Sequence, residues 1–243
     1  MRKQINNLMK KVISILACLI CVSFCYTEAK VKYQIKTGLG VSEYNGDSQA
    51  GNRFSGKIGL GVDIPLKGNW SIEPGLYYSG KGTQFKGLSV VATSSGSPDV
   101  VLSKYRNSLH YIEVPVHAVF GLKFGDYTKL SVKAGPYFAL GIKGTANIKT
   151  PMYNDYNANY PDDLFSDGCT YGGNSYLSFS DDDAIYTKPF RRFDVGASIG
   201  VDLLFRHVIL GFNTEIGVVK LSDDFLKGSP RNMASYVMVG YQF

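Results

Sequence analysis

Apolar and polar residues alternate along most of this chain, in segments that each follow a period of two. In residues 31–41 (VKYQIKTGLGV) every odd position is apolar or threonine, and every even position is lysine, glutamine or glycine. A period of two predicts a β-strand with one apolar face and one polar face. Seven further segments alternate in the same way, at residues 57–64, 70–82, 110–122, 129–144, 191–205, 208–219 and 233–243.

The connections between these eight segments alternate in length. The short stretches PLKGN, KFGDY and RH follow the second, fourth and sixth segments, whereas the other connections are long. Short turns at one end and long loops at the other are typical of an up-and-down barrel in an outer membrane. The pattern therefore predicts an all-β fold, an eight-stranded antiparallel up-and-down transmembrane β-barrel. Its external loops are expected at about residues 43–54, 82–109, 144–188 and 220–233.

The charged residues decide between a soluble barrel and a membrane barrel. The apolar side of the segments lacks charge, while the opposite side carries glycine together with Lys, Arg, Asp and Glu. Exposed strands disfavour glycine, so this charged side suits the narrow interior of a membrane barrel better than a soluble surface. Aromatic residues near the segment ends are expected to form interfacial girdles; they are Tyr33, Trp70, Tyr127, Phe205, Tyr241 and Phe243.

The first 29 residues are typical of a secretion signal, which predicts one barrel domain over residues 30–243. A basic region precedes the apolar run 12–24 and the small residues Thr27 and Ala29 of a cleavage site. Removal of this segment takes away four basic side chains and Glu28, which lowers the formal net charge from +6 to +3. That modest charge gives no support to a nucleic-acid partner. Cys169 is then the single remaining cysteine, so no intrachain disulfide is expected.

Four internal segments and the C-terminal strand carry a family resemblance. The segments are SIEPGLYYSGKG (71–82), HYIEVPVHAVFGL (110–122), KAGPYFALGIKG (133–144) and FDVGASIGVDL (193–203), and the terminal strand is YVMVGYQF. Together they resemble the PorT-like outer membrane β-barrel family of Gram-negative bacteria. The resemblance covers nearly all of residues 30–243 and implies a porin-type, OmpA-like eight-stranded barrel in the bacterial outer membrane. Barrels of this kind serve many functions, so the resemblance specifies a fold rather than an activity.

The same resemblance connects the end of the chain with assembly. Outer-membrane barrels commonly end in phenylalanine, with apolar residues at alternate positions before it, and Val237, Val239, Tyr241 and Phe243 match this arrangement. The resemblance implies that the barrel-assembly machinery recognises these residues. An ordinary amphipathic last strand would also alternate, but it would not require an aromatic residue at the final position.

Charged residues of both signs fall on the polar side of the segments and are expected to line the lumen. The predicted network consists of Lys36, Lys57, Asp63, Glu73, Lys81, Glu113, Lys133, Arg192, Asp194, Asp202 and Glu215, and Lys32 and Lys143 share its parity. Side chains can fill the interior of an eight-stranded barrel. An unpaired buried charge is costly, so we expect ion pairs that plug the lumen. A charged pore or a proton-linked site is the alternative.

The sequence predicts no catalytic, cofactor or metal site. His110 lies near Ser108 and Glu113, a loose match to outer-membrane lipid A deacylases, but His110 and Glu113 have opposite parity and their side chains should diverge. The segment 144–188 holds seven aspartates without the spacing of an EF-hand loop. We expect a solvated acidic loop there, with calcium binding as the alternative.

Three prolines fall inside predicted strands, at Pro74, Pro115 and Pro136. Proline has no N–H to donate, and a closed barrel has no free edge where a donor could be spared. Each proline therefore predicts either a β-bulge or a locally missing ladder bond.

These features together predict a non-enzymatic outer-membrane protein with a structural or interaction role that depends on its surface loops. The alternatives are a narrow porin-like passage for small solutes and an accessory barrel of a secretion system. The expected partners are outer-membrane lipid and lipopolysaccharide, the barrel-assembly machinery and an unknown surface ligand or protein. The barrel is expected to act as a monomer, without a cofactor.

Overall fold

The computed structural model describes residues 31–45, 51–92, 98–149, 157–160, 190–221 and 230–243. These residues form the strands β1 (Lys32–Asn45), β2 (Arg53–Pro65), β3 (Trp70–Ala92), β4 (Pro98–Phe124), β5 (Thr128–Lys149), β6 (Asn157–Tyr160), β7 (Phe193–Phe205), β8 (Val208–Gly217) and β9 (Arg231–Gln242). None of the described residues belongs to a helix that could cross a membrane. The predicted secretion signal, Cys169 and most of the predicted acidic loop lie outside the described residues.

Eight strands close into an antiparallel barrel. The order of neighbours is β4-β3-β2-β1-β9-β8-β7-β5, and pairing of β4 with β5 completes the circle. The short strand β6 pairs with the end of β5, from Ala146↔Tyr160 to Lys149↔Asn157, and is not part of the barrel wall. The predicted eight-stranded, up-and-down β-barrel is confirmed.

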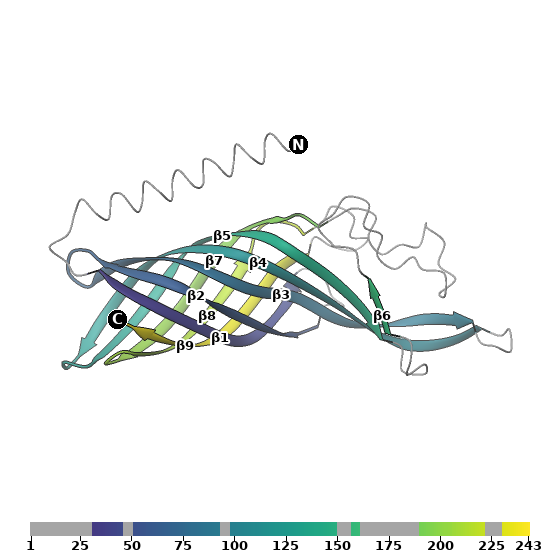
Figure 1. Cartoon of the computed structure of the whole chain (residues 1–243), viewed down its shortest axis with the longest axis horizontal. Helices are drawn as coiled ribbons and strands as arrows, with labels where there is room; N and C mark the ends of the chain where they lie inside the picture. The colour runs from purple at the N-terminus through teal and green to yellow at the C-terminus, as the bar shows by residue number, and fades with distance from the viewer. Residues whose placement is uncertain (1–30, 46–50, 93–97, 150–156, 161–189, 222–229) are drawn as a thin grey trace, which may run out of the picture.

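The two ends of the barrel differ. Tight turns join β2 to β3, β4 to β5 and β7 to β8, and the left-handed residues Gly68, Gly125 and Arg206, with φ between 55° and 70°, lie in these turns. Figure 1 shows the turns at the end of the barrel that carries the C-terminus. At the opposite end β3 and β4 project well past the barrel as a long hairpin. We call the two ends the turn end and the loop end.

The long hairpin corrects the expected loop at residues 82–109. The β3–β4 ladder continues beyond the barrel, from Lys81↔Leu109 to Ala92↔Pro98, so most of that segment is strand. The apolar alternation ends at Gly80 and Gly82, which have no side chain to continue it. Their backbone groups still take part in the ladder, because backbone pairing does not require a side chain. The loss of alternation therefore marks where the barrel wall ends, not where the strands end.

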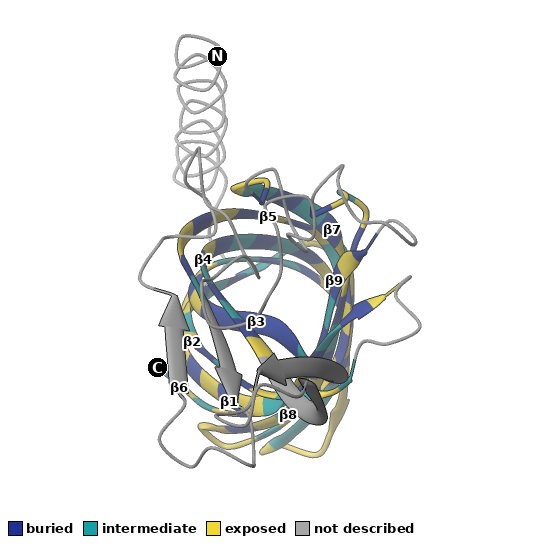
Figure 2. Ribbon diagram, turned by 90° about the vertical axis from the view of Figure 1, so that its right-hand side faces the viewer, coloured by how far each residue is buried: buried dark blue, intermediate teal, exposed yellow. Residues whose placement is uncertain are grey.

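Burial confirms that the barrel is apolar on the outside and polar on the inside. Lys36 and Lys81 are at most 1% exposed, whereas Leu39 is 61% exposed and Phe243 is 70% exposed. Figure 2 shows buried and exposed residues alternating along each strand of the wall. A soluble barrel would bury the apolar face, so this arrangement fits a barrel surrounded by lipid.

The three strand prolines interrupt three neighbouring ladders. The β2–β3 ladder stops between Gly61↔Gly75 and Ile64↔Ile72, the β3–β4 ladder between Pro74↔Val116 and Tyr77↔Glu113, and the β4–β5 ladder between Pro115↔Tyr137 and Ala118↔Ala134. Each ladder resumes in the same register. The prediction of locally missing ladder bonds is confirmed, and the alternative of a bulge at these prolines is wrong. We call this diagonal line of gaps across β2 to β5 the proline seam.

Candidate functional site

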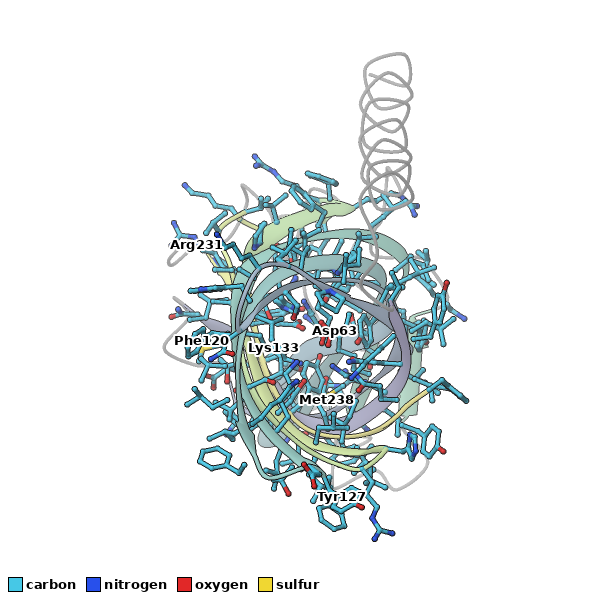
Figure 3. All side chains as sticks on the ribbon, turned by 90° about the vertical axis from the view of Figure 1, so that its left-hand side faces the viewer. Asp63, Phe120, Tyr127, Lys133, Arg231 and Met238 are labelled. Carbon is cyan, nitrogen blue, oxygen red and sulfur yellow. The ribbon has the colours of Figure 1, made fainter. Side chains whose placement is uncertain are left out.

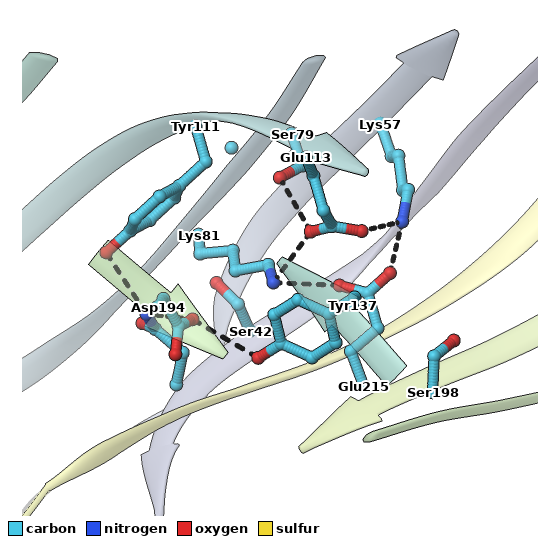
Figure 4. Close-up of polar contacts among 12 residues, drawn as sticks. Ser42, Lys57, Ser79, Lys81, Tyr111, Glu113, Tyr137, Asp194, Ser198 and Glu215 are labelled. Carbon is cyan, nitrogen blue, oxygen red and sulfur yellow. Dashed lines mark hydrogen bonds and ion pairs between the residues drawn. The ribbon is translucent and has the colours of Figure 1, made fainter. Parts of the chain in front are cut away.

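Four charged side chains meet in the lumen nearer the loop end. We call Lys57, Lys81, Glu113 and Glu215 the loop-end cluster; they come from β2, β3, β4 and β8. Lys81 Nζ lies 2.9 Å from Glu113 Oε2 and 2.9 Å from Glu215 Oε2. Lys57 Nζ pairs with the other oxygen, Oε1, of each glutamate. Each lysine therefore contacts both glutamates, and the four side chains form a closed, neutral ring (Figure 4).

A second ring lies nearer the turn end. We call Lys36, Lys133, Glu73 and Asp202 the turn-end cluster; they come from β1, β5, β3 and β7. Lys36 Nζ lies 2.8 Å from Glu73 Oε1 and 3.0 Å from Asp202 Oδ2. Lys133 Nζ lies 2.6 Å from the same Asp202 oxygen and 3.6 Å from Glu73 Oε1. The two clusters together connect every strand of the barrel wall except β9.

Both clusters are shielded from solvent and electrically balanced. Their eight side chains are at most 9% exposed, and each cluster contains two lysines and two carboxylates. Removing a charge from water is costly unless opposite charges surround it, and each of these charges has two counter-charges. Figure 3, seen from the turn end, shows side chains filling the barrel, with Asp63 and Lys133 among those that point inward.

Tyrosine rings pack around the loop-end cluster and explain many of the lumen glycines. Lys57 Nζ lies 4.7 Å from the centre of the Tyr77 ring, and Lys81 Nζ lies 4.2 Å from that of Tyr137. A Cβ atom at Gly59 would collide with the Tyr77 ring, and one at Gly196 with the Tyr137 ring. The glycines thus make room for aromatic as well as charged neighbours. Sequence reasoning missed these tyrosines, although they share the parity of the predicted network.

Other polar side chains extend the network. His117 Nε2 lies 2.9 Å from Ser198 Oγ, which donates to Asn213 Oδ1 at the same distance. Asp63, at the turn end, pairs with Lys129 at 3.4 Å. Asp194 is buried and accepts hydrogen bonds from Tyr137 Oη at 3.2 Å and Asn232 Nδ2 at 2.9 Å. Among the described residues, the ion pairs do not include Asp194, so neutral donors hold this carboxylate.

Three basic residues expected in the lumen are exposed. Arg192 is exposed and donates to the Gly141 carbonyl at 3.3 Å; it precedes β7, so strand alternation does not fix its direction. Lys32 is exposed at the start of β1. Lys143 is exposed because the β4–β5 register shifts: His110 pairs with Lys143, but Tyr111 pairs with Gly141. The extra residue in β5 is a bulge that reverses the parity beyond it.

The loose catalytic arrangement weighed for His110 does not form. Glu113 is fully buried in the lumen, whereas His110 lies half-buried on the outside, with Nδ1 2.6 Å from Tyr78 Oη. Within the described part of the chain, no three His, Cys, Asp or Glu side chains are grouped as metal ligands would be.

Three of the predicted assembly residues lie on the outer face of β9, and Phe243 directly follows that strand. Val237, Val239, Tyr241 and Phe243 are between 43% and 70% exposed. β9 pairs with β1 on one side and β8 on the other, so the first and last strands of the chain are neighbours in the barrel wall. Recognition of these residues by the barrel-assembly machinery stays a prediction.

A comparison with protein families agrees with this architecture. A family model described as outer membrane protein beta-barrel domain matches residues 22–222. Two similar solved structures are Ail of Yersinia pestis with the heparin analogue sucrose octasulfate (12% identity, 88% of this chain and 99% of that one, TM-score 0.38) and Neisserial surface protein A (11%, 87% and 97%, TM-score 0.40). A third is the N-terminal β-barrel domain of Pseudomonas aeruginosa OprF (11%, 86% and 97%, TM-score 0.31). No curated protein matches the chain.

Proposed function

Because the chain belongs to the outer membrane protein β-barrel domain family and so lies in the bacterial outer membrane, we propose that it is a non-conducting, non-enzymatic barrel that acts through its outer surface. Two parts of the molecule support this function: the filled lumen, and the long strands at the loop end. The first argues against passage of solutes, and the second argues for contacts outside the membrane.

The observation that carries the proposal is the pair of closed charge clusters. They lie one after the other along the lumen, so a solute would have to separate buried ion pairs twice to pass. Each lysine has two carboxylates within 3.6 Å, and losing either contact leaves a charge poorly compensated in a medium that solvates it weakly. The clusters therefore favour a closed lumen over a narrow porin-like passage.

The loop end supplies the surface through which the barrel would act. β3, β4 and β5 continue past the barrel wall, and β6 adds to the same sheet beside β5. The parts of these strands that lie past the wall are outside the membrane, where a ligand or a partner protein can reach them. The barrel then serves as a rigid support for that surface.

Planar lipid bilayers test the closed lumen. Purified wild-type protein should produce no stable single-channel steps. A variant in which the eight residues of both clusters are all changed to serine stays neutral but removes both sets of ion pairs, and it should produce steps or frequent openings. Heat-modifiable migration in SDS gels must first show that both proteins are folded. Reproducible wild-type steps would refute the proposal and favour the narrow passage.

Finer parts of the function are also proposed. An accessory role in a secretion system follows only from the PorT-like resemblance, and co-purification of partners from outer membranes would test it. The secretion signal at 1–29 and the monomeric state are also proposals, and recognition of Phe243 by the assembly machinery rests on the resemblance. Removal of Phe243 should lower the amount of folded barrel in outer membranes without changing expression.

A further inference from the structure

We propose that the barrel binds the phosphate of an outer-leaflet lipid on its outer surface, between His110 of β4 and Lys143 of β5. We call these two residues, with Tyr78, Ser108 and Thr145, the rim site. This inference goes beyond the function proposed above, because it concerns the lipid-facing wall and not the lumen or the loops.

The bulge in β5 creates the rim site. Without the bulge, alternation would place Lys143 in the lumen with Lys133. With the bulge, Lys143 is exposed on the outside, directly opposite His110. A β-bulge costs ladder hydrogen bonds, and it is commonly found where a side chain must be redirected. Here its consequence is to add a lysine to the outer face of the wall, next to the exposed apolar residues Leu140 and Ile142.

His110 is held in one orientation. Its ring stacks on Tyr78 with centroids 5.8 Å apart, and Nδ1 lies 2.6 Å from Tyr78 Oη. When the tyrosine hydroxyl donates to Nδ1, the neutral imidazole carries its hydrogen on Nε2. His110 then carries a donor at the position opposite Lys143 in the β4–β5 ladder, and an imidazole N–H and an ammonium both suit phosphate oxygens.

The surroundings match a lipid better than a free anion. On the side toward the membrane centre, the rim site adjoins Ile112, Leu140 and Ile142, which are 37%, 37% and 45% exposed. On the other side, Ser108 and Thr145 form the next outward-facing cross-strand pair, and Arg106 is exposed beyond them. The protein thus offers apolar side chains, then cations, then hydroxyl groups, in order from the membrane centre outward. A phosphorylated lipid has its acyl chains, phosphates and sugars in the same order.

Charge distribution separates this part of the rim from the β1 side. From Tyr78, Ile112 and Leu140 outward to Thr145, the described outward-facing residues of β3, β4 and β5 include no carboxylate. On β1, by contrast, the outward-facing residues Leu39 and Val41 are exposed, and the next residue of the same parity toward the loop end is Glu43. An anionic head group is therefore attracted to the β4–β5 side and repelled at β1.

Native mass spectrometry of the purified barrel in detergent tests the site. The probes are phosphorylated lipid A and the same lipid A after removal of its phosphates, each added to wild type, Lys143→Gln, Lys143→Arg and Lys220→Gln. Lys220 is the matched control, because it is an exposed lysine that follows β8 at the loop end. Heat-modifiable migration checks that every variant is folded.

Wild type, Lys143→Arg and Lys220→Gln should retain phosphorylated lipid A, and Lys143→Gln should bind it about tenfold more weakly, as expected for the loss of one charged hydrogen bond. Dephosphorylated lipid A should bind all four proteins equally weakly. Equal retention of both lipids by wild type, or unchanged binding by Lys143→Gln, would overturn the proposal. Displacement of the lipid by an equal concentration of inorganic phosphate would assign the site to free phosphate and overturn it as well.

Discussion

Lys81 illustrates how single residues contribute to the closed lumen. Its ammonium lies 2.9 Å from carboxylates on β4 and β8, and it approaches the ring of Tyr137 on β5. The side chain is fully buried, so water does not compensate its charge. The stability of the cluster therefore depends on the balance of two lysines and two glutamates more than on any single contact.

Replacing Lys81 with methionine should strongly destabilise the barrel. Glu113 and Glu215 would then share Lys57 alone, which leaves one buried negative charge without a partner. Breaking a buried ion pair in this way costs about 3–5 kcal/mol. Urea unfolding in detergent micelles, followed by heat-modifiable migration, measures the loss in the free energy of unfolding.

Two comparisons make that experiment decisive. Lys220→Met removes an exposed lysine and should change the free energy of unfolding by less than about 0.5 kcal/mol. The double variant Lys81→Met with Glu215→Gln restores neutrality, so its loss should be smaller than the sum of the two single losses. Strict additivity would contradict the closed ring.

Glycine packing gives a second prediction at the scale of residues. A methyl group at Gly196 would overlap the Ile216 carbonyl oxygen and the Tyr137 ring, whereas one at Gly56 has its nearest neighbour 3.7 Å away. Gly196→Ala should therefore lower the free energy of unfolding by about 1–3 kcal/mol, and Gly56→Ala should leave it nearly unchanged. Equal effects in the same urea titration would mean that the tyrosine does not rest on Gly196.

At the scale of strands, the proline seam divides the wall into two kinds of ladder. Pro74, Pro115 and Pro136 each leave a gap toward the preceding strand, and each is still paired with the following one. The β8–β9 ladder instead runs without a gap from Val208↔Tyr241 to Ile216↔Met233. Fewer ladder bonds make local opening easier, so the β2–β5 side of the wall should open first.

Hydrogen exchange of the folded barrel tests this difference. Backbone amides at residues 75–76 and 116–117, inside the gaps, should exchange about tenfold faster than those at residues 210–215, since one missing hydrogen bond accounts for a factor of that size. A Pro115→Val variant supplies a new donor and should reduce the difference near Gly75. Uniform protection around the barrel would show that the gaps have no energetic consequence.

The sequence could predict strands and faces, but not which charges meet. Parity follows from backbone geometry, so alternation correctly separates Lys36 and Lys57 from Leu39. Parity changes at a bulge, and no feature of residues 141–143 announced the bulge that exposes Lys143. The contacts between Lys57 and Glu215 depend on how strands far apart in the sequence are staggered around the barrel. Local alternation carries no information about that stagger.

The whole molecule consists of a barrel wall and a sheet that projects from it. The two clusters use residues up to Lys81 on β3 and from Glu113 on β4, so the projecting part of the hairpin supplies none of their charges. Folding of the wall and display of the projecting sheet should therefore be separable. If they are, the projecting part can be removed without loss of the barrel.

We expect the barrel to fold when residues 85–105 are replaced by Asn-Gly. Gln84 and Arg106 are paired in the β3–β4 ladder, and Asn-Gly favours the tight turn that joins two such strands. The variant should fractionate with outer membranes and keep heat-modifiable migration. A deeper cut from Ser79 to Tyr111, closed at the pair Tyr78↔Ile112, removes Lys81 and should lose both properties. If the shorter deletion also fails to fold, the hairpin stabilises the wall, and a purely external role for it is excluded.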